Sequence, residues 1–419
     1  MKDISGGVCA PKGFWAGGIR CGIKASARKP DLALIYSEQP CTAAAMYTGN
    51  RVKAASLIVS MEHLAGGTCR AVIANSGNAN ACTGEAGFAA ARRMAELASD
   101  ALSCRAGGPL RPEDTAVAST GVIGVPLPLR PIEQGIGALA ASLRNDAAGH
   151  EAALEAIMTT DTRKKQGAVE FEIAGKPVRI GGMVKGSGMI HPNLATMLCF
   201  VTTDADICRP LLDSALRRAV KHSFNRVTID GDTSTNDMIL VMANGLAGNP
   251  SIQTEGADYA VFAAALESLC VGLARETARD GEGASKLVTV KVHGADDDAD
   301  AELLAKTVAS SNLVKAACFG ADANWGRVLC AMGYSGADFD AEAVDVSFGG
   351  RAGHITVCRN GAFLSFSEED AKRILSQDEI EIDIELNRER PGGPGPGKAE
   401  VWGCDLTYDY VKINGDYRT

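Results

Sequence analysis

A threonine near the middle of the chain stands where self-cleaving acyl-transfer chemistry could begin. A glycine-rich approach over residues 181–193 leads to Ala195, and a β-prone apolar run starts at Thr196. The Thr196 hydroxyl could attack the carbonyl carbon of Ala195, and hydrolysis of the resulting ester would free the Thr196 α-amine. Such an amine has a reference pKa of about 7.7–8.0, so it can act as a general base near neutral pH. Because many strands begin with threonine, the spacing alone does not establish cleavage.

The elements that must position this segment alternate irregularly between strand and helix patterns. Apolar or alternating runs predict strands at residues 71–75, 115–120, 196–203, 226–230, 287–292, 344–348, 379–386 and 399–411, and a hairpin over 167–182. Helical spacing is found at residues 86–102, 210–222 and 257–277. The segment 390–398 is too rich in Pro and Gly for either element and joins the last two strands. This pattern predicts an α+β fold of layered sheets covered by helices.

The overall composition favours a small-molecule enzyme over a binder of polyanions. The chain has 419 residues, which is enough for several packed layers or two domains. Its formal net charge is −9, and its acidic and basic residues are interleaved. Neither nucleic acid nor an anionic membrane surface is therefore expected as a partner.

Cysteine and histidine usage indicates a reducing compartment and no metal site. The 13 cysteines are scattered without a CxxC pair, and the six histidines have no metal-ligand spacing. The first residues lack the apolar core of a secretory signal, and no apolar run approaches the roughly 20 residues of a membrane span. We therefore expect a cytoplasmic protein.

Several motifs together identify a family. The run 185–205, KGSGMIHPNLATMLCFVTTDA, resembles the cleavage-site signature of the ornithine acetyltransferase (glutamate N-acetyltransferase) family of arginine biosynthesis. Similarity extends along nearly the whole chain, through DLALI (31–35), NRVKAA (50–55), NSGNANACTG (75–84), STGVIG (119–124), MTTDT (158–162), SFNRVTIDGDTSTND (223–237), DGEGASK (280–286), GADANWGR (320–327) and DLTYDYVKIN (405–414). Chance convergence over so many segments is negligible, and the chain is identified as a member of this family.

The resemblance implies a cleaved, two-lobed enzyme with an α/β/β/α-type sandwich. Cleavage between Ala195 and Thr196 would give an α chain of residues 1–195 and a β chain of residues 196–419. The two chains would stay associated, as two α and two β chains.

The implied reaction is a ping-pong acetyl transfer without a cofactor. Thr196 would take the acetyl group from N2-acetylornithine, release ornithine, and pass the group to glutamate to give N-acetylglutamate. The Thr120 hydroxyl and the Gly121 backbone N–H match the family's oxyanion hole, and a glycine there permits close backbone approach. No residue decides whether acetyl-CoA also serves as a donor.

The resemblance also implies two charged contacts for the amino-acid substrates. Lys185 matches the family's substrate-binding lysine and would pair with an α-carboxylate. Glu282 matches the substrate-binding glutamate, and a carboxylate suits the ammonium group of ornithine. Considered without the family, both residues look like ordinary loop charges.

Three more contacts carry over from the family. Thr159 matches a substrate-binding threonine, although the neighbouring Thr160 and Thr162 leave the register open. Asn414 and the terminal Thr419 match the contacts that the family makes with its C-terminus. An ordered tail in a binding site is unusual, because most chain ends fray.

Alternative functions include a non-enzymatic binding protein, although every residue that matches the family's site is present. A self-cleaving threonine hydrolase, such as the related aminopeptidases, would transfer the acyl group to water instead of to glutamate. An aspartate-nucleophile phosphatase is suggested by Asp230 and Asp232 after an apolar run, but Ser234 breaks that pattern. His191 could be a base, although a positional role beside the cut is favoured, and Cys199 is expected to be a buried apolar residue instead of a nucleophile.

Overall fold

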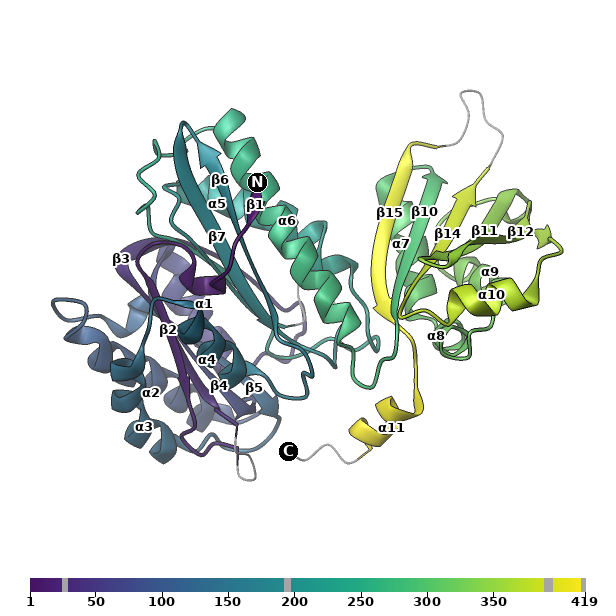
Figure 1. The fold of residues 1–419 in the computed structure, drawn as a ribbon. Helices are drawn as coiled ribbons and strands as arrows, with labels where there is room; N and C mark the ends of the chain where they lie inside the picture. The colour runs from purple at the N-terminus through teal and green to yellow at the C-terminus, as the bar shows by residue number, and fades with distance from the viewer. Residues whose placement is uncertain (25–28, 192–196, 388–394, 416–419) are drawn as a thin grey trace.

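The computed structural model describes residues 1–24, 29–191, 197–387 and 395–415, arranged in two lobes (Figure 1). The larger lobe contains a nine-stranded sheet, and the smaller contains a six-stranded sheet. Ala195, Thr196 and Thr419 lie outside the described residues. The last helix leaves the smaller lobe and returns toward the larger one (Figure 1).

The larger lobe is built from the first part of the chain. Its strands are β1 (Lys2–Asp3), β2 (Phe14–Ile19), β3 (Leu32–Tyr47), β4 (Thr68–Asn78), β5 (Thr115–Val122), β6 (Lys165–Ile173), β7 (Lys176–Lys185), β8 (Leu198–Thr203) and β9 (Met238–Ala243). They run in the order β1-β6-β7-β8-β9-β3-β4-β5, with β2 also paired to β3. The helices are α1 (Ala55–His63), α2 (Gly84–Ser103), α3 (Leu129–Ser142), α4 (Ala147–Ile157), α5 (Arg209–Lys221) and α6 (Ala257–Arg279).

The long strand β3 folds this sheet into two layers. Its residues 32–36 pair with β2 and β4, and its residues 42–47 pair with β9, with a register shift between them. One apolar core joins the two halves, bringing Phe200 and Leu240 together with Ile35 and Val72. Helices α5 and α6 cover the outer face of β6–β9, and α2 and α3 cover the other outer face. The predicted α/β/β/α sandwich is therefore confirmed.

Central strands β8 and β9 are apolar because both of their faces are covered. Every residue of Leu198–Thr203 and of Met238–Ala243 is buried, and the two strands run parallel. A strand buried on both faces reads as a continuous apolar run without alternation. The strand predicted at 196–203 is confirmed from Leu198 onward.

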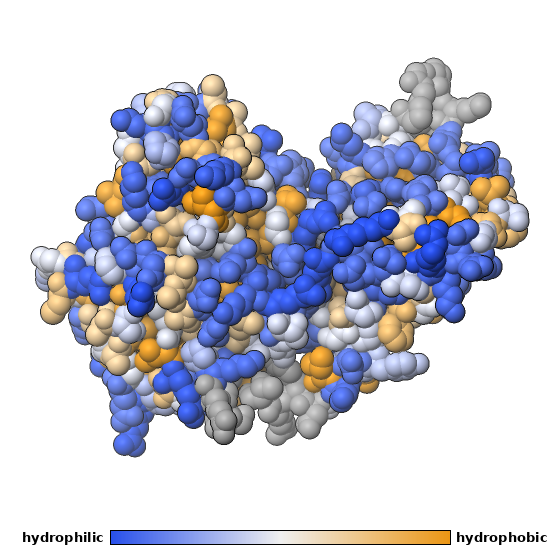
Figure 2. Space-filling view, in the orientation of Figure 1, coloured by the Kyte–Doolittle hydropathy of each residue, from blue (hydrophilic) through white to orange (hydrophobic). Residues whose placement is uncertain are grey.

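The smaller lobe is a sheet with helices against it. Its strands are β10 (Leu287–Ala295), β11 (Val344–Gly350), β12 (Gly353–Arg359), β13 (Ala362–Phe363), β14 (Glu379–Leu386) and β15 (Gly397–Cys404), in the order β13-β12-β11-β14-β10-β15. The helices are α7 (Asp298–Ser310), α8 (Asn312–Phe319), α9 (Trp325–Gly333), α10 (Glu368–Leu375) and α11 (Tyr408–Asn414). In Figure 2 the surface where the two lobes meet is mainly hydrophilic.

Helix α6 connects the lobes. It is long and apolar enough to cross a membrane by length and composition. In this fold its apolar side chains, including Phe262 and Leu269, share a core with strands β6–β9 and with Trp402 of β15. It is therefore a core helix between two sheets.

Two strand predictions are wrong. Residues 226–230 form the end of a 3₁₀ turn (Phe224–Arg226) and a loop with a single bridge from Val227 to Trp402. Their polar side chains form hydrogen bonds with neighbouring segments, and these bonds compete with the backbone pairing of a β-strand. The strand predicted over 399–411 ends at Cys404, because the Thr407 hydroxyl accepts the Asp409 N–H and caps helix α11.

Candidate active site

A cavity of about 330 Å³ lies where strand ends of the larger lobe, the loops that follow them and helix α11 meet. Six of the predicted site residues line it: Thr120, Gly121, Thr159, Lys185, Glu282 and Asn414. Met197, the first described residue after Thr196, also lines it. Residues from β5, β7, the loops after α4 and α6, and helix α11 thus come together next to the predicted cleavage point.

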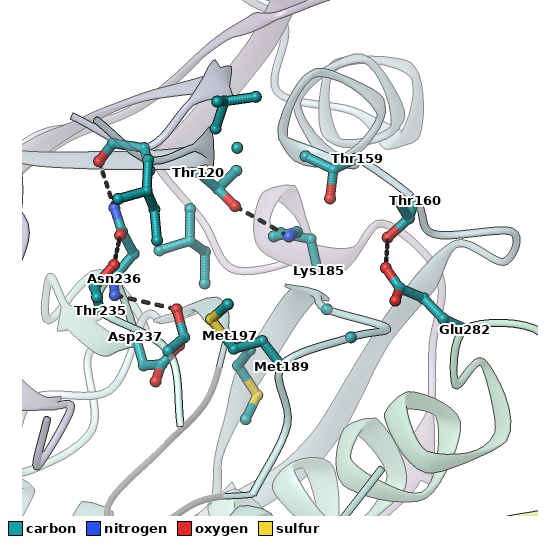
Figure 3. A pocket seen from close by; sticks show the side chains of 18 of the residues that line it. Thr120, Thr159, Thr160, Lys185, Met189, Met197, Thr235, Asn236, Asp237 and Glu282 are labelled. Carbon is teal, nitrogen blue, oxygen red and sulfur yellow. Dashed lines mark hydrogen bonds between the residues drawn. The ribbon is translucent and has the colours of Figure 1, made fainter. Parts of the chain in front are cut away.

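The Thr120–Gly121 pair ends strand β5 on one wall. Gly121 has φ +134°, and a Cβ there would lie 2.4 Å from the carbonyl carbon of Gly77 in the neighbouring strand β4. Only glycine fits such a close approach. The Thr120 Oγ1 accepts a hydrogen bond of 3.1 Å from Lys185 Nζ (Figure 3). Thr120 and Gly121 therefore lie together on the cavity wall, and their role as the oxyanion hole remains a prediction.

Lys185 places a buried cation in the cavity. It is the last residue of β7, and only 9% of it is exposed. Burial lowers the pKa of its ammonium group, and the negative charge of Asp161 acts against that shift. A cation partly stripped of water next to a cavity is suited to binding a carboxylate.

Behind Lys185 lies a buried ion cluster that the sequence did not reveal. Lys165 Nζ is 2.7 Å from Asp161 Oδ1 and 2.5 Å from Asp280 Oδ2. Asp161 also accepts the backbone N–H groups of Gly186 at 2.7 Å and Thr159 at 2.9 Å. Burial raises the pKa of Asp161, but the charges of two lysines outweigh it and hold this pKa well below its usual range. The cluster joins the segments that carry Thr159, Lys185 and Glu282.

Glu282 forms the opposite wall. Its Oε1 accepts a hydrogen bond of 2.7 Å from Thr160 Oγ1, and its Oε2 accepts one of 2.8 Å from Asn414 Nδ2. Figure 3 shows Thr160 and Glu282 facing one another, with Lys185 between them and Thr120. The cavity therefore has a cation on one side and a carboxylate on the other.

The fold reduces the number of threonines that could be the predicted substrate contact. Thr159 and Thr160 both line the cavity, and Thr160 is bonded to Glu282. Thr162 instead bonds Asp280 through its hydroxyl and backbone N–H. Thr162 therefore belongs to the ion cluster, and the predicted substrate contact remains with Thr159 or its neighbour.

The loop before β9 contributes residues that the site prediction missed. Asn236 donates its amide N–H groups to the carbonyl oxygens of Ala79 and Ser119, at 2.6 and 2.8 Å. Asp237 is 2% exposed, and its Oδ2 has no hydrogen-bond partner among the described residues. Burial raises the pKa of Asp237 well above its usual range. Both residues lie in the motif 223–237. Because several polar residues follow one another there, the sequence does not indicate which of them face the cavity.

His191 and Cys199 have structural surroundings. His191 Nδ1 lies 3.0 Å from Thr228 Oγ1, and burial, with the Lys306 charge, lowers its pKa to about 4. His191 is therefore neutral at pH 7, which supports a positional role. Cys199 is fully buried in β8, and burial raises its pKa, so it is the small apolar residue that was predicted.

The alternative phosphatase nucleophile is engaged in the backbone. Asp230 Oδ2 accepts the Met189 N–H at 2.5 Å, and its Oδ1 accepts the Ile190 N–H at 2.8 Å. Both oxygens are thus occupied by main-chain donors. This geometry gives no support to an aspartate nucleophile.

Comparisons with known proteins show the family of this chain. The family model described as ArgJ family matches residues 15–419. The chain is 53% identical over 420 residues to the arginine biosynthesis bifunctional protein ArgJ of Symbiobacterium thermophilum, covering 100% of both chains.

Two solved structures are also similar in sequence. One is ArgJ from Bacillus halodurans, with 47% identity, 52% of this chain and 97% of that chain covered, and a TM-score of 0.48. The other is ornithine acetyltransferase complexed with ornithine from Mycobacterium tuberculosis, with 44% identity, 45% and 96% covered, and a TM-score of 0.42. From the family match and its full-length relative, the chain belongs to the ArgJ family of bifunctional arginine biosynthesis enzymes, as its sequence predicted.

Proposed function

We propose that this enzyme transfers the acetyl group of N2-acetylornithine to glutamate through an ester on Thr196. The observation that carries the proposal is the cavity with Lys185 on one side and Glu282 on the other, beside Met197. Both substrates are amino acids, so their carboxylate and ammonium groups need opposite charges at fixed places. The ArgJ relatives are named for arginine biosynthesis, which agrees with such substrates.

Maturation begins with one acyl shift. The Thr196 hydroxyl oxygen bonds to the Ala195 carbonyl carbon, the C–N bond breaks, and the nitrogen takes up the hydroxyl proton. Water then hydrolyses the Ala195 ester. The products are the Ala195 carboxylate, which ends an α chain of residues 1–195, and a free Thr196 that begins a β chain of residues 196–419.

Acetyl transfer then uses the same oxygen twice. The Thr196 amine accepts the hydroxyl proton, Oγ bonds to the acetyl carbon, and the amide C–N bond breaks as the proton passes to ornithine. The glutamate amine next bonds to the ester carbon, the C–O bond to Thr196 breaks, and the amine proton passes to Oγ, which gives N-acetylglutamate and regenerates the Thr196 hydroxyl. The Thr120 hydroxyl and Gly121 N–H would stabilise the oxyanion at each step, where losing one donor typically costs about 3–4 kcal/mol.

In this cavity the charged groups orient the substrates. Lys185 would hold the α-carboxylate of either substrate, and Glu282 would hold the side-chain ammonium of the ornithine moiety. Thr159 or Thr160, Asn414 and Thr419 would complete the contacts. Assembly as two α and two β chains, a cytoplasmic location and turnover without a cofactor are parts of this proposal.

Cleavage and transfer are tested together by substitution at the nucleophile. We expect Thr196→Ala to stay as one 43.5 kDa chain and to be inactive, and Thr196→Ser to retain part of both activities. Denaturing electrophoresis and N-terminal sequencing detect the cleavage, which should produce a second N-terminus with the sequence Thr-Met-Leu-Cys. Robust acetyl transfer by the alanine variant would overturn the assignment.

A hydrolase that transfers the acetyl group to water is the second candidate. It differs from a transferase in the acceptor of the acetyl group, which is water instead of glutamate. Ornithine release from N2-acetylornithine should depend on glutamate if the enzyme is a transferase. Release that ignores glutamate would identify the hydrolase. Replacing N2-acetylornithine by acetyl-CoA in the same assay shows which donors are accepted.

A further inference from the structure

Residues 189–191, which precede the predicted cleavage point, are bound to the loop 228–233. Asp230 accepts the N–H groups of Met189 and Ile190, at 2.5 and 2.8 Å. The Ile229 N–H donates to the Ile190 carbonyl oxygen at 2.7 Å, and Thr233 Oγ1 donates to that of His191 at 2.9 Å. Residues 189–191, which directly precede positions 192–196, are thus held by four hydrogen bonds.

The other side of the cleavage point is held by the same stretch of chain. The Met238 N–H donates to the Met197 carbonyl oxygen at 2.8 Å, where β9 starts beside β8. Residues 228–238 therefore contact the chain both before and after the Ala195–Thr196 bond. One short segment therefore anchors the described residues on both sides of positions 192–196.

The backbone before the cut is in a restricted conformation that Asp230 supports. Met189 has φ +57°, in the left-handed region that is unfavourable for a residue with a side chain. A Cβ on the preceding Gly188 would lie 2.3 Å from Glu282 Oε2, so the chain runs close against the cavity wall. The two hydrogen bonds to one carboxylate satisfy the N–H groups of Met189 and Ile190 in this turn.

We propose that Asp230 is a positioning residue for self-cleavage, which holds the segment 189–191 so that Ala195 meets the Thr196 hydroxyl. This inference rests on the proposed function. Asp230 exchanges no proton and touches no substrate: it accepts main-chain hydrogen bonds before the cut and retains the end of the α chain afterwards. Because attack geometry depends on small displacements, loosening the anchor slows the acyl shift.

Cleavage kinetics test this role directly. The full-length chain is made by cell-free synthesis, and its conversion to two fragments is followed by denaturing electrophoresis. We expect Asp230→Asn, which replaces one acceptor oxygen by an amide donor, to slow cleavage about tenfold or more. Thr233→Val, which removes one of the four bonds, should slow it less.

Two matched variants separate positioning from general stability. Asp204 is also buried and accepts two backbone N–H groups, from Lys12 at 3.1 Å and Arg179 at 2.8 Å, at the far end of β8. The Tyr410 phenol contacts Asp230 and is also close to the charges of Glu282 and Asp232, and Tyr410→Phe removes its hydroxyl without changing the Asp230 carboxylate. We expect Asp204→Asn and Tyr410→Phe to cleave within about twofold of the wild-type rate.

The decisive readout is activity per cut molecule. In Asp230→Asn the cleaved fraction should have the wild-type kcat and KM, because Asp230 acts before catalysis. Equal cleavage rates in Asp230→Asn and wild type would overturn the inference, as would an equal slowing in Asp204→Asn. A wild-type chain that is never cut would overturn the proposed function as well.

Discussion

Glu282 and Asn414, which are 132 positions apart in the sequence, are joined by a hydrogen bond of 2.8 Å from the asparagine Nδ2 to the glutamate Oε2. The carboxylate follows helix α6, and the amide comes from α11, the last helix of the chain. One wall of the cavity is therefore held by a helix that returns from the smaller lobe. The last described helix of the chain therefore contributes directly to the cavity wall.

Removing this amide should weaken substrate binding. A hydrogen bond to a charged group contributes about 1.5–3 kcal/mol, so we expect Asn414→Ala to lower kcat/KM for N2-acetylornithine by roughly tenfold or more. Val411→Ala, on the exposed side of the same helix, is the control and should leave kcat/KM unchanged. Steady-state kinetics check both, and an unaffected Asn414→Ala would show that Glu282 is held well enough by Thr160.

The buried cation of Lys185 should matter for both substrates. Lys185→Gln keeps a donor near Thr120 but removes the charge that would bind an α-carboxylate. We expect kcat/KM to fall about 30-fold or more for N2-acetylornithine and for glutamate alike, from the loss of a charge-assisted bond. Lys176→Gln, at the exposed start of β7, is the control. A fall confined to one substrate would argue against a shared carboxylate site.

The ion cluster behind the site should be essential for stability. Lys165, Asp161 and Asp280 have side chains that are at most 1% exposed. Lys165→Met would leave two buried carboxylates without their cation, which typically costs about 3–5 kcal/mol of the free energy of unfolding. Lys164→Met, next to it on the surface, should cost less than about 1 kcal/mol. Urea unfolding measures both, and equal losses would contradict the prediction.

The stability of the chain should depend on pH through Asp237. Burial raises the pKa of this carboxyl in the folded state, whereas an unfolded aspartate has a pKa of about 3.9. Between these two values the unfolded chain binds fewer protons, so the contribution of Asp237 to stability falls as pH rises. We therefore expect Asp237→Asn to gain stability relative to wild type between about pH 4 and 7.

Urea unfolding at several pH values, on chains in the same state of cleavage, measures this difference. Asp3→Asn, with an exposed carboxyl, serves as the control. If Asp237→Asn and wild type keep a constant difference in unfolding free energy across this range, the carboxyl is charged in the fold, and the prediction is wrong.

Some features were readable because they depend on local patterns. The continuous apolar run of β8 predicts a strand, and the spacing of residues 257–277 predicts a helix. The strand expected at 226–230 was wrong because the Asp230 side chain binds the backbone of a distant segment, which no local pattern reveals. Helix α11 was missed because the cap at Thr407 outweighs the strand preference of the aromatic residues that follow.

By itself the sequence determined the family, the layered α+β class and six residues that proved to share one cavity. These features could be identified because they depend on motifs and patterns of residues that are contiguous in the chain. Only the tertiary structure showed that Thr162 binds Asp280 instead of lining the cavity, that Lys165 pairs with Asp161 and Asp280, and that Asp230 binds the segment before the cleavage point. These are contacts between residues far apart in sequence. They depend on how the two halves of one sheet and the returning C-terminal helix pack together. Local sequence patterns do not show which of these distant segments come into contact.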